Sequence, residues 1–447
     1  MVAIKNRSLI LLVLLITMPW TRPAIGAGQV FKVQYPPSDK PGELVVGVTY
    51  RVWIPDGVTR LRGLIIHQHG CGRRASLGGR TAADDLHWQA LAKKWDCALL
   101  GPSYRQSDDQ RCPRWCDPRL GSRDRFLQAL DELAESSGHA ELATVPWCLW
   151  GHSGGAIWAS LMQISDPERV VGVWLRSGSA LGAWEKDDLP KPAIPKAVYE
   201  VPVMCNPGTK ENADKRFDDA WTGTLSTFRA YREQGAPIAF APDPRTKHEC
   251  GDSRYLAIPF FDACLAARLP DKGSRVKTLK PFQLTQGWLA PCLGDTAVPA
   301  AEYRDDPEAA NWLPNERIAK AWMEYVKTGT VGDATPPSAP FDLKSAETPN
   351  GGTAISWDAT ADLESGIEAF IIQRDGQEIG RVPEKRIGRF GRPLFQVMSY
   401  HDTPEVPLPA MRFVDPAAKA GIKSRYQVIA VNGQGIRSEP SPAAEGP

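Results

Sequence analysis

An alternation of short apolar runs with longer amphipathic runs, between residues 61 and 327, constrains the fold of this chain more than any other feature. The apolar runs do not alternate strictly with polar residues, which is typical of strands buried on both faces of a sheet. The amphipathic runs have helical periodicity, so the segment predicts parallel strands joined by crossover helices. Upstream, residues 30–54 predict antiparallel strands that lead into this sheet.

The texture of the sequence changes after a linker rich in Pro, Gly and small residues at 329–340. Short strand-like runs separated by turn residues follow, and they predict an all-β sandwich. At about 150 residues per domain, the 447 residues are expected to form an α/β domain at 28–328 and a β domain at 341–447. We expect chemistry on a small soluble substrate to need only the first domain.

The charge balance excludes one class of partner. Lys and Arg total 53 against 52 Asp and Glu, which gives a formal net charge of +1. A chain with this balance has no broad basic field to hold nucleic acid or an anionic membrane. Its hydrophobic content of 42% is that of ordinary globular proteins, which excludes global disorder.

The first 27 residues have the pattern of a signal peptide. Two basic residues precede an apolar core at 9–18, and small residues at 24–27 supply a cleavage site. The apolar core is shorter than the ~20 residues that span a bilayer, and no later segment is apolar for long enough. We therefore expect a secreted or periplasmic protein whose mature chain has no transmembrane segment.

Export makes disulfides possible among the nine cysteines, although their odd number leaves at least one thiol unpaired within the chain. The spacing of Cys112 and Cys116 predicts a local disulfide. A zinc site is the alternative for clustered cysteines, but the chain has no Cys-x-x-Cys pair to support it.

The motif GHSGG at 151–155 lies directly between a predicted strand at 147–150 and a predicted helix at 155–164. A nucleophile elbow requires this context, because its serine occupies a strained strand-to-helix turn where flanking side chains would collide with backbone. Ser153 is therefore the predicted catalytic nucleophile. A Gly-rich structural turn is the alternative.

An elbow serine needs a general base and an acid that orients the base, in the chain order Ser, acid, His. Only His248 and His401 follow Ser153. His401 lies beyond the linker, whereas His248 lies in a loop after the last predicted strand, so His248 is the predicted base. The histidines before the nucleophile are interpreted as structural or as lining of the site: His67, His69, His87, His139 and His152.

The acid is expected in the loop after a predicted strand at 202–206. Glu211 is the first carboxylate there and is the predicted acid. Asp214, a short step later, and Asp243, just before His248, are the alternatives. If one of these aspartates is the acid, Glu211 only stabilises the start of the next helix through the helix dipole.

The oxyanion hole is predicted in the Gly-containing sequence HGCG at 69–72, after a predicted strand at 62–67. Glycines let backbone N–H groups face a developing negative charge. We assign the hole to the N–H groups of Cys71 and Gly154, with a plain Gly-rich turn as the alternative. No elbow surrounds Cys71, so it is expected to be a structural thiol or a disulfide partner.

These residues resemble the α/β-hydrolase superfamily, in particular secreted esterases of the polyhydroxybutyrate depolymerase and feruloyl esterase type. The resemblance rests on HGC at 69–71, GHSGG around Ser153, GTKE ending at Glu211, and His248 ahead of a helix. It covers roughly residues 61–269. The family more often has Asp where Glu211 stands, and residues 270–312 match no part of it.

The C-terminal segment resembles a fibronectin type III domain. The resemblance rests on AISWDA with Trp357, GIEAFIIQRDG as a central strand and turn, and YQVIAVNGQG with Tyr426. Residues 382–411 form an inserted loop that is longer than this module usually has.

The resemblances imply an α/β-hydrolase fold with a mostly parallel central sheet, followed by a fibronectin type III-like sandwich. They imply a serine esterase that works through an acyl-enzyme with Ser153, His248 and Glu211, and that needs neither a metal nor an organic cofactor. A serine peptidase of the same fold and an inactive surface-binding protein are the alternatives. The sequence does not identify the ester substrate, which could also be polymeric or polysaccharide-linked. The loops at 104–117 and 177–184 are candidates to line the substrate pocket.

Overall fold

The structure is a computed structural model that describes residues 27–446 except 187–188, 275–277, 386–387, 390–391, 394, 409 and 420. The predicted signal peptide, apart from its last residue, lies outside the described residues. Within the described part of the chain, no helix has both the length and the hydropathy needed to cross a membrane.

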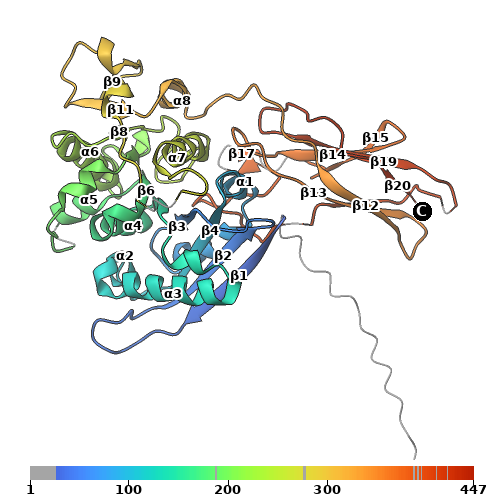
Figure 1. Ribbon diagram of the computed structural model, residues 1–447, viewed down its shortest axis with the longest axis horizontal. Coiled ribbons are helices and arrows are strands. Elements are labelled where there is room, and N and C mark those ends of the chain that lie inside the picture. The colour runs from blue at the N-terminus through green and yellow to red at the C-terminus, as the bar shows by residue number, and fades with distance from the viewer. Residues whose placement is uncertain are drawn as a thin grey trace, which may run out of the picture.

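An eight-stranded sheet forms the centre of the larger part of the molecule (Figure 1). Its strand order is β1-β2-β4-β3-β5-β6-β7-β8; β1 and β2 pair antiparallel, as do β2 and β4, and every other pair is parallel. The strands are β1 (Gly28–Tyr35), β2 (Gly47–Pro55), β3 (Gly63–Gln68), β4 (Cys97–Arg105), β5 (Trp147–His152), β6 (Val170–Arg176), β7 (Val203–Asn206) and β8 (Ile238–Phe240). The predicted α/β class with a mostly parallel sheet is confirmed.

Helices cover both faces of this sheet because its strands are apolar on both sides. In β3, Leu64 and Ile66 point into one core, which is shared with α3 to α6, and Ile65 points into the other, which is shared with α1, α7 and α8. The helices are α1 (Leu86–Lys94), α2 (Pro113–Cys116), α3 (Ser122–Ser137), α4 (Gly154–Ser165), α5 (Ala180–Glu185), α6 (Asp218–Arg232), α7 (Arg254–Arg268) and α8 (Glu316–Thr328).

Residues 270–312, which the family resemblance leaves unmatched, contribute a small antiparallel sheet beside β8. It contains β9 (Trp288–Pro291), β10 (Val298–Pro299) and β11 (Ala310–Leu313). The Asn311 side chain accepts the backbone N–H of Phe240 at 2.6 Å. This contact satisfies a donor at the open edge of the large sheet.

The C-terminal region is a sandwich of two antiparallel sheets, which confirms the all-β prediction. One sheet has β12 (Phe341–Glu347), β13 (Thr353–Asp358) and β18 (Arg412–Asp415); the other has β14 (Ala369–Arg374), β15 (Gln377–Val382), β19 (Arg425–Val431) and β20 (Ala444–Glu445). Trp357 and Phe370 meet across the interior edge to face, with ring centroids 5.3 Å apart. A short two-stranded ribbon of β16 (Gly388–Arg389) and β17 (Arg392–Pro393) follows β15.

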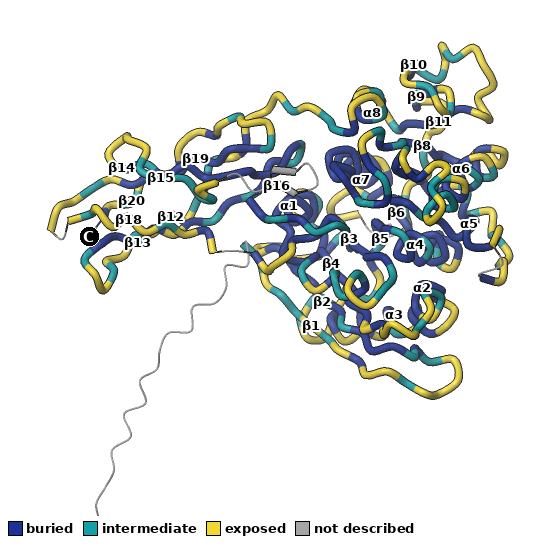
Figure 2. The backbone as a smooth tube through the Cα atoms, turned by 180° about the vertical axis from the view of Figure 1, so that it is seen from behind, coloured by how far each residue is buried: buried dark blue, intermediate teal, exposed yellow. Residues whose placement is uncertain are grey.

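The sandwich is packed onto the α/β region rather than separated from it. Leu86 and Ala90 of α1 belong to the same apolar core as Trp357 and Phe370. The Gln396 side chain accepts the N–H of Leu86 at 2.9 Å and donates to the Asp84 carbonyl at 2.7 Å. Figure 2 shows buried backbone continuing from α1 into the near end of the sandwich.

A buried ion cluster strengthens this junction. The Arg254 guanidinium, at the start of α7, donates to both oxygens of Asp85 at 3.1 and 2.6 Å and to Asp402 at 2.9 Å. All three side chains are buried, and Asp85 also accepts N–H groups at the start of α1. The expectation that small-substrate chemistry needs only the first domain therefore loses its structural basis.

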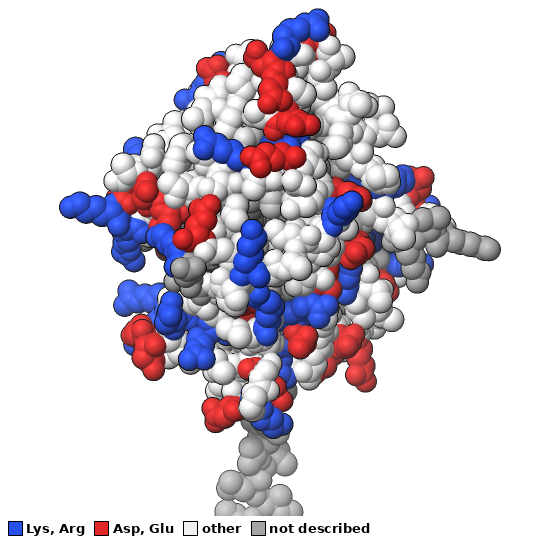
Figure 3. Space-filling view, turned by 90° about the vertical axis from the view of Figure 1, so that its left-hand side faces the viewer, with Lys and Arg blue, Asp and Glu red and all other residues white. Residues whose placement is uncertain are grey.

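Charged side chains of both signs are intermingled on the face that carries β9 and α5 (Figure 3). This pattern agrees with the formal net charge of +1. A single-sign field of the kind that holds nucleic acid is not present on that face.

Candidate active site

Ser153 occupies a strained turn between β5 and α4. Its φ of 56° and ψ of −122° lie in a region that side-chain-bearing residues rarely adopt. A Cβ at Gly151 would lie 2.3 Å from the carbonyl oxygen of Gly155, and one at Gly155 would lie 2.4 Å from the carbonyl oxygens of Gln68 and His69. The turn therefore needs glycine at both positions, which is the geometry expected of a nucleophile elbow.

The loop at 69–72 passes directly beside the elbow. A Cβ at Gly154 would lie 1.9 Å from Cys71 Sγ, and one at Gly70 would lie 3.0 Å from the Cβ of Ser153. Gly154 is the first residue of α4, so its N–H has no acceptor within the helix. The two residues assigned to the oxyanion hole are thus neighbours at the helix N-terminus, where negative charge is stabilised.

A disulfide between Cys71 and Cys112 fixes this loop. The predicted local disulfide of Cys112 with Cys116 is therefore wrong: Cys112 is bonded to Cys71, and Cys116 is buried outside this disulfide. The Cα atoms of Cys71 and Cys112 are 5.5 Å apart, within the usual range for a disulfide. The three sulfur atoms lie within 4.8 Å of one another, and two of them are used by the disulfide rather than available to a metal.

His248 and Glu211 are in direct contact. His248 Nδ1 lies 2.5 Å from Glu211 Oε1. The other carboxylate oxygen of Glu211 accepts the Ser177 hydroxyl at 3.1 Å and the N–H of Gly208 at 2.9 Å. Glu211 is fully buried, so these donors hold both its oxygens in place.

The neighbours of His248 fix its ring and its backbone. Phe217 stacks on the imidazole with ring centroids 4.0 Å apart and an interplanar angle of 9°. The buried Arg176 guanidinium donates to the Thr246 hydroxyl at 2.8 Å and to the carbonyls of Lys247 and Glu249. The loop that carries His248 is therefore clamped from inside the sheet.

The two rival carboxylates are engaged elsewhere. Asp214 pairs with Lys247 at 2.5 Å and accepts the N–H groups of Arg216 and Phe217, so it caps the turn before α6. The helix α6 itself begins four residues later, at Asp218. Asp243 is buried and accepts the Tyr325 hydroxyl at 3.1 Å.

His401 was not the predicted base because it lies beyond the linker, but its side chain extends from the sandwich to the site. Its Nδ1 lies 2.6 Å from Nδ1 of His152, whose Nε2 lies 2.7 Å from the carbonyl oxygen of His248. His152 must donate from Nε2 to that carbonyl, so its Nδ1 accepts from Nδ1–H of His401. The N–H of Cys250 donates to the Tyr400 carbonyl at 3.2 Å, which joins the same two loops by their backbones.

Burial determines the charge of these histidines. Desolvation, with a smaller contribution from nearby His248, lowers the pKa of His401 to about 4. Desolvation also holds the pKa of His152 well below its usual value, with His401 and His248 adding to the effect. Both rings are therefore neutral at pH 7, as their shared hydrogen bond requires.

The remaining histidines fall into structural and lining positions, as interpreted. His67 stacks on Trp150 at 3.8 Å, His87 pairs with the Leu363 carbonyl at 2.9 Å, and His139 pairs with Glu141 at 3.0 Å. His69 is buried 5.4 Å from the ring of His401.

A cavity of about 650 Å³ opens beside the oxyanion loop. Cys71, Gly72, Arg73 and His401 contribute to its lining. Of the loops expected to line a pocket, 104–117 does so through residues around Arg105, whereas Trp115 is buried and stacks on Tyr104 at 4.5 Å. In the other loop, Ser177 supports Glu211, and Trp184 faces a separate cavity.

Comparison with known proteins identifies no family, because no family model and no curated protein matches the chain. Among solved structures, S-formylglutathione hydrolase from Agrobacterium tumefaciens aligns over 54% of this chain and 94% of its own, with 14% identity and a TM-score of 0.35. A thermostable esterase aligns over 48% of this chain and 54% of its own, with 12% identity and a TM-score of 0.32.

The C-terminal region has neighbours of its own. An Fn3-like protein from Clostridium thermocellum aligns over 25% of this chain and 94% of its own, with 16% identity and a TM-score of 0.17. With TM-scores this low, none of these likenesses carries the argument, which rests on the geometry of the site.

Proposed function

We propose that the protein is a secreted serine hydrolase of the α/β-hydrolase fold that cleaves carboxylic esters. The observation that carries the proposal is the contact between His248 and the fully buried Glu211, beside the strained turn of Ser153. A structural turn has no need of an imidazole that is oriented by a buried carboxylate. A nucleophilic serine does.

The contact assigns the proton positions. Because the Glu211 carboxylate only accepts hydrogen bonds, Nδ1 of His248 carries a proton, and Nε2 is the nitrogen left to act as the general base. As Ser153 Oγ bonds to the ester carbonyl carbon, its proton passes to Nε2, and Glu211 stabilises the imidazolium. Among the described residues the Ser153 hydroxyl forms no hydrogen bond, and such contacts often tighten only when substrate binds.

The next steps use the same groups. The N–H groups of Cys71 and Gly154 stabilise the oxyanion of the tetrahedral intermediate. His248 then returns the proton to the leaving alcohol, which departs as the acyl-enzyme forms. Water attacks the acyl group by the same route, and the acid product and free Ser153 are released.

The sandwich has a positioning role in this proposal. His401 and His152 form a hydrogen-bonded chain that ends on the backbone carbonyl of His248. The loop at 395–408 therefore supports the base loop from outside, as Arg176 does from inside. The fibronectin type III-like region, proposed at 341–447, would act as part of the catalytic unit and not as a tethered module.

The test is the hydrolysis of 4-nitrophenyl acetate by two variants. Ser153→Ala and His248→Ala should each lower kcat by a factor on the order of 10⁴ or more. Ser136→Ala and His139→Ala are matched controls at positions outside the site and should leave kcat unchanged. Folded Ser153→Ala protein that keeps most of its kcat would refute the proposal.

A further inference from the structure

A second cavity lies over the antiparallel edge of the large sheet, where β1 and β2 pair. Its volume is about 1090 Å³. Along β1 and β2 the residues alternate: Val33 and Tyr50 enter the core shared with α3, whereas Lys32 and Arg51 face the cavity. One face of this edge is therefore apolar and packs against α3, and the other face is polar and lines the cavity.

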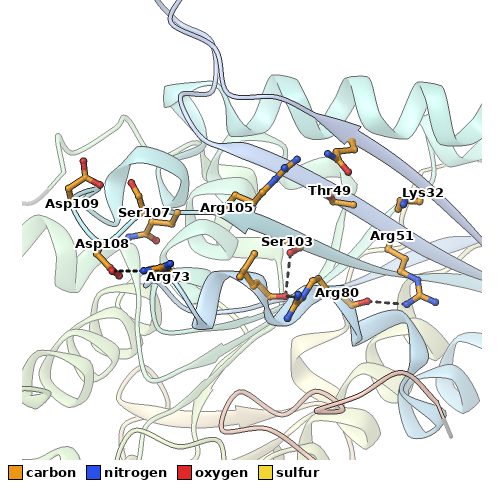
Figure 4. A pocket seen from close by; sticks show the side chains of 13 residues that line it. Lys32, Thr49, Arg51, Arg73, Arg80, Ser103, Arg105, Ser107, Asp108 and Asp109 are labelled. Atoms are coloured by element: carbon orange, nitrogen blue, oxygen red, sulfur yellow. Dashed lines mark hydrogen bonds and ion pairs between the residues drawn. The ribbon is translucent and has the colours of Figure 1, made fainter.

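The open surface is rich in positive charge. Five cationic side chains line the cavity, from Lys32, Arg51, Arg73, Arg80 and Arg105, against two carboxylates. Figure 4 shows them ranged along it, from Arg73 at one end to Lys32 and Arg51 at the other. The lining differs in this respect from the face in Figure 3, where both signs are intermingled.

Two of the five cations have carboxylate partners. Arg51 donates to both oxygens of Asp84, at 2.6 and 2.8 Å, and Arg73 pairs with Asp108 at 3.2 Å. Within the described residues, Lys32, Arg80 and Arg105 have no ion pair. Their three charges are available to a ligand.

The strand register places two of the cations against each other. Lys32 of β1 lies directly opposite Arg51 of β2. Like charges in directly opposed positions destabilise a sheet, and only Arg51 is compensated by a carboxylate. A bound anion would relieve this repulsion.

The cationic cavity adjoins the cavity beside the oxyanion loop. Arg73 and Asp108 line both. The N–H of Gly72, next to Cys71, donates to the side chain of Gln106 at 3.0 Å, and Gln106 lines the cationic cavity. A substrate with its ester at Ser153 could therefore extend past Cys71 into the cationic cavity.

We propose that this cavity binds a carboxylate of the substrate, so that the substrate class is esters that carry a negative charge away from the scissile bond. The proposal rests on the proposed esterase activity. Arg105 and Lys32 are the principal binding groups, because both are exposed to the cavity and unpaired within the described residues.

The experiment compares esters that are matched except for charge, using the full-length protein. Mono-4-nitrophenyl succinate against 4-nitrophenyl butyrate tests a carboxylate on the acyl side. The 4-acetoxybenzoate ion against its methyl ester tests a carboxylate on the alcohol side. The readout is the ratio of kcat/KM for the anionic ester to kcat/KM for the neutral one.

We expect one of the two ratios to exceed one and to fall about fivefold in Arg105→Ala and in Lys32→Ala, the change that loss of one exposed ion pair produces. Arg105→Lys should keep most of the ratio, and about 0.5 M salt should lower it. Neutral esters should be cleaved at the same rate in all these variants. Arg412→Ala, at an exposed arginine of the sandwich, is the matched control.

Wild-type ratios at or below one for both pairs would overturn the proposal, as would ratios that do not change in Arg105→Ala and Lys32→Ala. Both results leave intact an esterase that cleaves neutral esters through Ser153. If no ester is cleaved in a Ser153-dependent manner, the proposed function fails and the inference fails with it.

Discussion

The α/β region and the C-terminal sandwich contribute to the site in different ways. The loop at 69–72, Ser153 and Glu211 follow β3, β5 and β7, which lie within four consecutive strands of one parallel sheet, so the sheet brings them to the same edge. His401 reaches the same place only because two sheets of another region dock against α1 and α7. Residues that follow strands of one sheet can be predicted to lie together from the local sequence pattern. A residue such as His401, which reaches the site because two regions pack together, cannot.

Removal of the sandwich should have the largest effect. A chain that ends at Thr335 exposes Leu86 and Ala90 and leaves Arg254 without Asp402. Apolar exposure and a partly unpaired buried charge are both costly, so we expect the shortened chain to lose cooperative thermal unfolding and all ester hydrolysis. Circular dichroism melts and the 4-nitrophenyl acetate assay measure both.

Retained stability and activity in the shortened chain would contradict the role given to the sandwich. A shortened chain that melts as cooperatively as the full-length protein, and that cleaves the soluble ester at the same rate, would show that the linker at 329–340 separates two independent domains.

The next largest effect concerns the acid. Glu211→Gln should lower kcat by a factor on the order of 10² to 10⁴, because an amide neither holds the reactive tautomer of His248 nor stabilises its imidazolium. Asp214→Asn and Asp243→Asn should change kcat little, since those carboxylates bind Lys247 and Tyr325 instead. A large loss confined to one of these two aspartate variants would move the acid there.

These three carboxylates also show how much the sequence could predict. The strands, the elbow glycines and the base loop follow from local pattern and agree with the structure to within a few residues at most boundaries. Glu211 and Asp214 are three positions apart in one loop, so spacing cannot separate them. Which of the two is the acid depends on their tertiary contacts: Glu211 is buried and accepts the Ser177 hydroxyl, whereas Asp214 pairs with Lys247.

Two other features depend on distant parts of the chain. Cys112 is bonded to Cys71, 41 positions away, and not to nearby Cys116, because the elbow helix brings the loop at 69–72 against α2. His401 lies 249 positions from His152. The segment 382–411, which the sequence led us to expect as an inserted loop, contains His401 and is the sequence feature that could have indicated this contact.

The smallest effect should appear in the pH dependence of stability. Burial lowers the pKa of His401 from 6.5 to about 4. The unfolded chain therefore binds a proton there at a pH where the folded protein does not, and the free energy of unfolding falls as pH drops from about 6.5 to about 4. The groups around His401 are His69, His152 and His248.

His401→Gln removes one of these depressed titrations, so its stability should fall less steeply across that range than that of the wild type. Urea unfolding between about pH 7 and pH 4.5 measures the slope. His139→Gln, at a histidine outside the site, is the matched control. Equal slopes in wild type and His401→Gln would show that His401 does not titrate as a buried group.

Covalent labelling of the full-length protein by a fluorophosphonate, with the modified residue located by mass spectrometry, tests whether Ser153 is the activated nucleophile. We expect a single adduct on Ser153, no adduct in Ser153→Ala, and much slower labelling in His248→Ala, because the probe needs a serine activated by its base. Adduct formation that persists in Ser153→Ala, or a folded wild-type protein that cleaves esters without being labelled at Ser153, would contradict that assignment.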